Sequence, residues 1–193
     1  MAKVSRRVIW RRRHASDYHE TIECAVKSDG SSPATEFLVT LSRGNWRADP
    51  EHNPPRDREQ IRDCEMLMAK IEHIGEEGCP DTGTSVNHLE EGIWEFKHAR
   101  CRLTYWDTPG DGTFNPKLKI DDVRTNQGPE GCDFLWYPRM DPYLRLGCAW
   151  PKEGQLAPPE GIAEGRTIRE EDCAHDQPST DSGELELPRG NGS

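Results

Sequence analysis

LEEGIWEFKHARCRLTY, residues 89–105, is the stretch that decides the fold. Within it and just after it, residues 93–97 and 101–106 form two short runs rich in aromatic and aliphatic side chains. Residues 98–100 separate the runs, and a gap of three residues is typical of a β-hairpin. The sequence therefore predicts two paired strands at the heart of a sheet.

The chain before this hairpin predicts strand and helix in turn. Residues 8–10 and 21–26 have the composition and alternation of short strands. Ser32 and Pro33 suit the N-cap and the first position of a helix. The clearest helix spans residues 56–77, because apolar side chains recur there at steps of three and four residues. These side chains are Ile61, Cys64, Leu67, Met68, Ile71 and Ile74.

The chain after the hairpin predicts one more strand and one more helix. Residues 113–143, with scattered Pro, Gly and aromatic residues, interrupt the pattern as an insertion. Residues 144–150 predict a strand, and Pro158 and Pro159 favour the start of a final helix. We expect an α+β domain over residues 1–172, with a disordered acidic tail over residues 173–193.

Composition and charge narrow the class of protein. The chain has 193 residues, a formal net charge of −10, and seven cysteines. The cysteines are scattered without a CxxC pair, and no apolar run approaches a signal segment or a membrane span. We therefore expect a soluble, reduced, cytoplasmic protein without a membrane partner. The spacing of Cys, His and acidic residues favours neither a zinc nor a calcium site, so we expect no metal and no cofactor.

Three blocks of sequence carry a resemblance to a known family. They are SDGSSPATEFLVTL (residues 28–41), VNHLEEGIWEFKHARCRLTYW (residues 86–106) and LRLGCAWPKEGQLAPPEGI (residues 144–162). In this order they resemble the RelE/HigB toxin superfamily, particularly its phage-derived HigB-like branch. The resemblance covers about 130 residues, with the insertion at about 113–143 between the second and third blocks. It implies a RelE-like fold, in which an N-terminal strand and two helices pack on a small, mainly antiparallel sheet that a C-terminal helix follows.

The same resemblance implies a function. Members of this superfamily are the toxins of type II toxin–antitoxin systems, and they cleave messenger RNA on the ribosome without a metal. The RNA's own 2′-hydroxyl attacks the phosphate, so the enzyme needs a base, an acid and fixed positive charge. The expected partners are the ribosome, mRNA and a cognate antitoxin of the helix-turn-helix class.

Six residues match or adjoin the family's active positions. Lys97 and Arg102 would stabilise the phosphate, with help from Arg100 and Lys152. Tyr105 or His98 would stack on a base or transfer a proton. These six are the candidate catalytic residues.

The residue types also allow blander roles. Lys97 and Arg102 suit exposed strand positions that pair with Glu95, Tyr105 suits a core position, and His98 suits a solvated turn. Because side chains alternate along a strand, Arg102 and Tyr105 share a face only if the strand twists or bulges.

Departures from the family pattern keep a second function open. Glu153 and Leu156 stand where the family has basic residues, and residues 148–149 replace a His-Gly pair. The acidic balance is also unusual for a nuclease that acts on the ribosome. The alternative is therefore a non-catalytic RelE-like module, of phage or mobile-element origin, that binds a protein.

Overall fold

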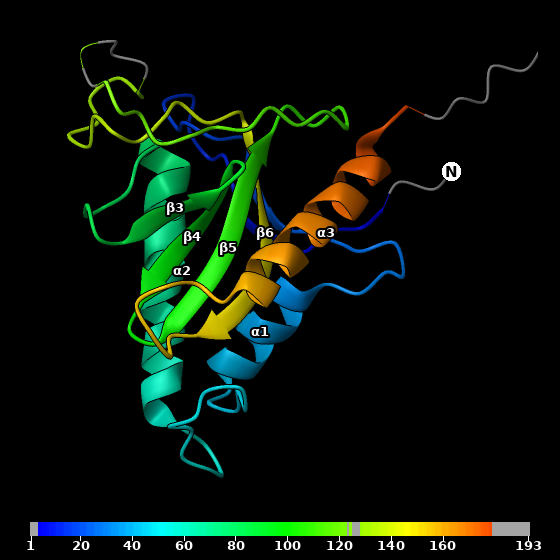
Figure 1. The fold of residues 1–193 in the computed structure, drawn as a ribbon, viewed down its shortest axis with the longest axis vertical. Helices are drawn as coiled ribbons and strands as arrows, with labels where there is room; N and C mark the ends of the chain where they lie inside the picture. The colour runs from blue at the N-terminus through cyan, green and yellow to red at the C-terminus, as the bar shows by residue number, and fades with distance from the viewer. Residues whose placement is uncertain (1–3, 123, 125–127, 179–193) are drawn as a thin grey trace, which may run out of the picture.

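A computed structural model describes residues 4–122, 124 and 128–178. Within these residues six strands form one sheet in the order β1-β2-β6-β5-β4-β3 (Figure 1). Strands β2 and β6 are parallel, and all other neighbours are antiparallel. The strands are β1 (Val8–Arg11), β2 (Thr21–Cys24), β3 (Val86–Glu90), β4 (Ile93–His98), β5 (Cys101–Thr108) and β6 (Tyr143–Pro151). The α+β class and the mainly antiparallel sheet are thus confirmed.

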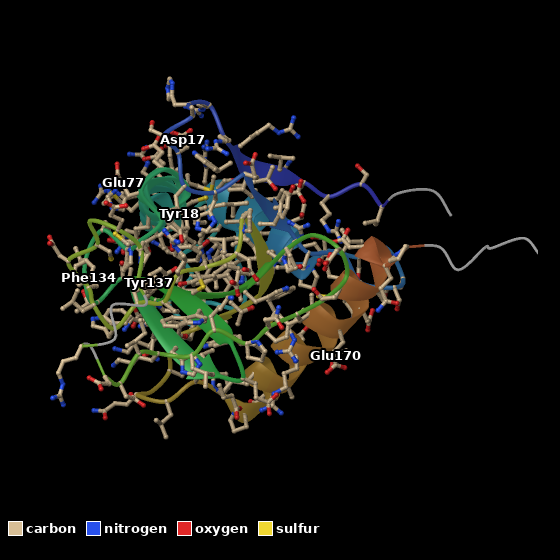
Figure 2. The ribbon with its side chains drawn as sticks, turned by 90° about the horizontal axis from the view of Figure 1, so that it is seen from above. Asp17, Tyr18, Glu77, Phe134, Tyr137 and Glu170 are labelled. Carbon is tan, nitrogen blue, oxygen red and sulfur yellow. The ribbon has the colours of Figure 1, made fainter. Side chains whose placement is uncertain are left out.

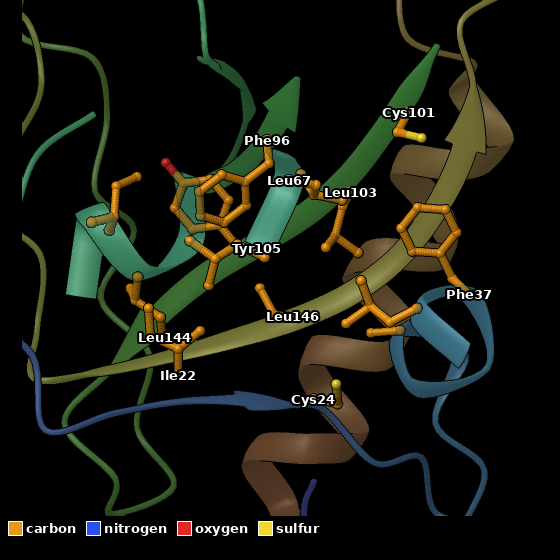
Figure 3. Packing of buried hydrophobic residues seen from close by; sticks show 14 of the residues in the cluster. Ile22, Cys24, Phe37, Leu67, Phe96, Cys101, Leu103, Tyr105, Leu144 and Leu146 are labelled. Carbon is orange, nitrogen blue, oxygen red and sulfur yellow. The ribbon is translucent and has the colours of Figure 1, made fainter. Parts of the chain in front are cut away.

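Three helices cover the two faces of this sheet. Helices α1 (Pro33–Ser42) and α2 (Arg58–Glu77) pack into the main hydrophobic core, and α3 (Pro159–Asp176) packs on the other face. Figure 3 shows the main core, in which Phe37 of α1 and Leu67 of α2 lie over the sheet. The sheet contributes to this core Ile22, Phe96, Leu103, Tyr105, Leu144 and Leu146.

The hairpin of β4 and β5 divides its side chains between the two faces. Phe96 pairs with Leu103 across the strands, and both are fully buried in the main core. Their neighbours Lys97 and Arg102 also pair with each other. Because successive side chains in a strand point to opposite faces, Lys97 and Arg102 lie on the α3 face.

Helix α2 begins at Arg58, two residues after the predicted start at residue 56, and ends at Glu77 as predicted. The Asp57 carboxylate accepts hydrogen bonds from the backbone N–H groups of Glu59 and Gln60, at 2.9 and 3.3 Å. Gly78 ends the helix in the left-handed region, with φ at 72°, where glycine is favoured. Ser32 is the N-cap of α1, as predicted, but its hydroxyl contacts the Thr35 hydroxyl and caps no backbone N–H.

Several elements differ from their predicted bounds by one or two residues, and the hairpin turn is Ala99 and Arg100 where residues 98–100 were predicted. Two differences are larger. Strand β3 was not predicted, because only Val86 of its five residues is buried and the apolar alternation is weak. Helix α3 continues through Cys173, which is buried, to Asp176, so the tail predicted from residue 173 begins inside a helix. The rest of that tail, residues 179–193, lies outside the described residues.

A buried ion cluster fixes the end of α3 to the sheet. Asp172 accepts the backbone N–H of Val26 at 2.8 Å and pairs with Arg6 at 2.8 Å. Arg145 of β6 lies 3.4 Å from Asp172 and 3.4 Å from Asp176. Asp176, which lies in the stretch predicted as a disordered tail, therefore helps Asp172 to hold α3 in place.

The inserted segment folds against the end of the hairpin farthest from its turn. The Trp94 indole donates to the Lys117 carbonyl at 2.9 Å, and Trp136 stacks on Trp94. Viewed from above, Phe134 and Tyr137 lie toward the α2 side of the molecule and Glu170 of α3 lies on the other side (Figure 2). No helix among the described residues is long and apolar enough to cross a membrane.

Candidate active site

A pocket of about 330 Å³ opens on the α3 face, at the turn end of the hairpin. Strands β4 and β5 form one side of it, and the loop from β6 to α3 forms the other. The described residues of the inserted segment contribute nothing to its lining. The lining residues are Asn87, Glu95, Lys97, Arg102 and residues 150–158.

Three of the six predicted residues come together in this pocket. Lys97 and Arg102 are cross-strand partners, and Lys152 follows β6 directly. The backbone N–H of Lys152 donates to the Arg100 carbonyl at 2.7 Å, which fixes Lys152 beside the turn. Burial, and secondarily the charges of Arg102 and Lys152, lower the pKa of Lys97. We call these three residues, with Glu95, the cation pocket.

Arg102 is held against the turn by its own side chain. Its Nη1 donates to the carbonyls of Ala99 and Cys101, at 3.1 and 2.7 Å. These bonds use one nitrogen of the guanidinium. They place a permanent positive charge at the rim of the pocket.

Glu95 is the pocket residue that sequence reasoning missed as a candidate. Its side chain is buried, with 5% exposure, and lines the same pocket as the three cations. Asn87 donates to its Oε1 at 3.4 Å, and Oε2 makes no hydrogen bond to the described residues. Burial raises the pKa of Glu95, although Arg102 and Lys97 oppose the shift. Its position two residues before Lys97 was the available signal, because it places both on one face.

The structure separates Tyr105 from the pocket. Tyr105 is fully buried on the α2 face, where its hydroxyl lies 3.2 Å from that of Tyr137. Burial raises the pKa of Tyr105 far above its ordinary value. The bulge between β5 and β6 at residues 103–105 does not bring Tyr105 to the face of Arg102. A stacking or proton-transfer role for Tyr105 is therefore incompatible with its position.

His98 and Arg100 also turn away from the pocket. His98 Nε2 lies 3.3 Å from Asp63 of α2. Arg100 forms ion pairs with Asp49 and Glu51, at 3.1 and 2.5 Å. Neither residue lines the pocket, so the phosphate contact predicted for Arg100 and the proton transfer predicted for His98 are not supported by the geometry.

Two of the positions at which the sequence departs from the RelE/HigB pattern that it resembles, Glu153 and Leu156, line the pocket. Glu153 and Leu156 are in the loop that forms the outer wall, and Leu156 is 90% exposed. Trp150 supplies an aromatic surface on the same wall. The pocket therefore combines three cations and one buried carboxylate with an apolar wall.

This arrangement suits an anion with an apolar or aromatic portion. The three cations outnumber the two carboxylates that line the pocket, Glu95 and Glu153, so its formal charge is positive by one in a chain whose net charge is −10. The described residues contain no group of three His, Cys or acidic side chains that could hold a metal ion. A phosphate on Lys97, Arg102 and Lys152 would lie beside a carboxylate that can accept a proton.

Comparisons with known proteins add no family to this description. No protein-family model matches the chain, and no curated protein matches it.

Proposed function

We propose that this chain is a RelE/HigB-like toxin, a metal-independent endoribonuclease whose cation pocket cleaves the phosphodiester bond of mRNA on the ribosome. The observation that carries the proposal is that Lys97, Arg102 and Lys152 line one pocket together with buried Glu95. An acidic surface elsewhere would repel RNA, so a local positive pocket is where a phosphate binds.

Each pocket residue has a chemical role in this proposal. Glu95 accepts the proton of the 2′-hydroxyl, which attacks the neighbouring phosphorus and forms a 2′,3′-cyclic phosphate. The bond from phosphorus to the 5′-oxygen breaks, and Lys97 gives that oxygen a proton. Arg102 and Lys152 stabilise the negative charge on the phosphate oxygens. Burial favours both transfers, because it raises the pKa of Glu95 and lowers that of Lys97.

The partners follow from the same proposal. mRNA on the ribosome is the substrate, and a cognate antitoxin, a small helix-turn-helix protein, keeps the toxin inactive. A reading frame for such a protein beside that of this chain would support the assignment.

Induced expression tests the proposal. The wild-type chain is expected to stop growth and cut mRNA, and the Lys97→Ala, Arg102→Ala double variant is expected to do neither. Arg62→Ala, Arg124→Ala is the matched control, because both arginines are exposed and lie outside the pocket. If wild type leaves growth and mRNA intact, the enzyme proposal fails; if both double variants are as toxic as wild type, the pocket assignment fails.

The second candidate function is a non-catalytic module that binds a protein. Glu153 and the exposed Leu156 at the pocket's mouth favour it, because they offer an acidic and an apolar contact where an RNA-binding surface would be basic. This candidate predicts no RNA cleavage by wild type. It also predicts that Leu156→Ser weakens the complex with the neighbouring gene's product.

A further inference from the structure

Acidic side chains form ion pairs with the turn between β4 and β5, on the face opposite the pocket. Arg100 pairs with Asp49 and Glu51, which belong to the loop before α2. His98 lies 3.3 Å from Asp63 of α2. We call Asp49, Glu51 and Asp63 the acid clamp. It contacts the turn but lines no part of the pocket.

Backbone carbonyls of this turn hold two of the three pocket cations, Arg102 and Lys152. Ala99 has a φ of 45°, in the left-handed region that a residue with a Cβ rarely adopts. Its carbonyl, with that of Cys101, accepts Arg102 Nη1. The next carbonyl, of Arg100, accepts the N–H of Lys152. The conformation of this turn therefore sets the positions of Arg102 and Lys152.

The acid clamp is itself held in place by α2. Asp49 is 8% exposed, and its Oδ2 accepts the Gln60 side chain at 3.3 Å. Gln60 also bonds the backbone of Trp46 in both directions, at 2.9 and 3.0 Å. A connected series of contacts thus leads from α2 through Asp49 and Arg100 to the pocket.

We propose that Asp49, with Glu51 and Asp63, is a positioning residue for the cation pocket, acting through Arg100 and the turn on Arg102 and Lys152. The inference rests on the proposed RNA-cleaving function for its catalytic readout. A strained turn persists only where its surroundings determine it. A displacement of about 1 Å in a catalytic group can lower a rate about a hundredfold.

The sign of the effect on RNA makes this proposal testable. Removing an acidic side chain from a protein that binds a polyanion strengthens binding by general electrostatics. Positioning predicts the reverse for Asp49→Ala, because Arg102 and Lys152 lose their places. We expect affinity for a single-stranded oligoribonucleotide and kcat/KM for its cleavage on ribosomes each to fall about tenfold or more, with Asp49→Glu restoring part of both.

Two further variants serve as control and safeguard. Glu59→Ala removes an exposed carboxylate near the start of α2 that does not contact the hairpin turn between β4 and β5. This variant is expected to leave RNA affinity unchanged or raise it. Glu51→Ala removes an acid whose side chain is 71% exposed, so it is expected to fold and to lower both quantities less than Asp49→Ala does. RNA affinity that rises equally in all three alanine variants would overturn the positioning role.

An NMR measurement keeps this proposal separate from the proposed function. In the full chain without RNA, Asp49→Ala is expected to shift the Lys152 amide and Arg102 side-chain signals, and Glu59→Ala is not. If wild type neither binds nor cuts RNA but these shifts occur, the proposed function fails and the positioning contact stands. Unchanged signals in Asp49→Ala would overturn the positioning contact whatever the RNA experiments show.

Discussion

At the scale of single residues, strand alternation decides which predicted groups can act together. Lys97 and Arg102 share a face because the turn has two residues, Ala99 and Arg100, so that the two side chains pair across the strands. The sequence predicted a gap of three residues and did not fix this register. The same alternation placed Tyr105 on the other face unless the strand was distorted, and the structure keeps it there. Glu95 escaped notice as a catalytic candidate, because only the packing of the pocket shows that it is buried and lines the same pocket as the cations.

Glu95→Gln tests the base at this scale. The amide cannot accept the proton of the 2′-hydroxyl, so the rate of single-turnover cleavage is expected to fall about a hundredfold to ten-thousandfold. RNA affinity is expected to hold or rise, because a negative charge leaves the pocket. Glu153→Gln is the control, since that carboxylate lies at the exposed mouth.

The pH profile gives the same test a second readout. The base acts when ionised, so wild-type cleavage is expected to decline as pH falls through the pKa of Glu95. Burial places that pKa above the ordinary 4.5. A Glu95→Gln variant that cleaves at the wild-type rate with the same acid limb would rule Glu95 out as the base.

At the scale of elements, a strong apolar repeat in the sequence predicted its helix well, whereas stretches with a weak or polar pattern were predicted poorly. The repeat of apolar residues in α2 was sufficient because the whole helix packs one stripe on the sheet. Edge strand β3 has little buried surface, so its sequence carries little strand signal. The end of α3 was misplaced because the sequence from residue 173 is polar, and only the tertiary contacts of Asp176 with Arg6 and Arg145 show that the helix continues to that residue.

Asp172→Ala is expected to loosen α3. The substitution removes one ion-pair partner from each of the buried guanidinium groups of Arg6 and Arg145, and it removes the acceptor of the Val26 N–H. Breaking such a buried cluster costs about 3–5 kcal/mol. Urea denaturation measures the loss, and Glu170→Ala, at a side chain that is 73% exposed, is expected to change stability little. Equal stabilities for the two variants would contradict the anchoring role.

Asp107 at the end of β5 couples the inserted segment to pH. Its carboxylate accepts the Asp141 N–H at 2.6 Å, and burial, with the nearby Asp141 charge, raises its pKa to about 7. The folded chain therefore keeps a proton that the unfolded chain, with a pKa near 3.8, releases. The contribution of Asp107 to stability is greatest at acid pH and is lost as pH rises from about 4 to about 7.

Asp107→Asn removes this dependence, because an amide stays neutral and can still accept the Asp141 N–H. The variant is therefore expected to be more stable relative to wild type at pH 8 than at pH 5, which means a larger difference in the free energy of unfolding at pH 8. Chemical denaturation at the two pH values measures the difference. A difference that is the same at both pH values would contradict the raised pKa.

At the scale of the whole molecule, charge is distributed in a way that suits a selective RNA enzyme. The chain carries 35 acidic and 25 basic residues, yet three cations converge on one pocket. Some of the remaining acidic side chains form ion pairs within the protein, where they hold the hairpin turn and fix α3 to the sheet. A negative net charge therefore does not argue against RNA at the pocket itself, although it weakens general attraction to RNA elsewhere on the surface.

The most direct test is the chemistry of RNA ends produced by the purified chain on programmed ribosomes. The account predicts new mRNA fragments that end in a 2′,3′-cyclic phosphate, formed without added metal by wild type and by Arg62→Ala, Arg124→Ala. It predicts none from Lys97→Ala, Arg102→Ala. Fragments of the same kind and amount from that pocket variant, or no cleavage by wild type, would contradict it.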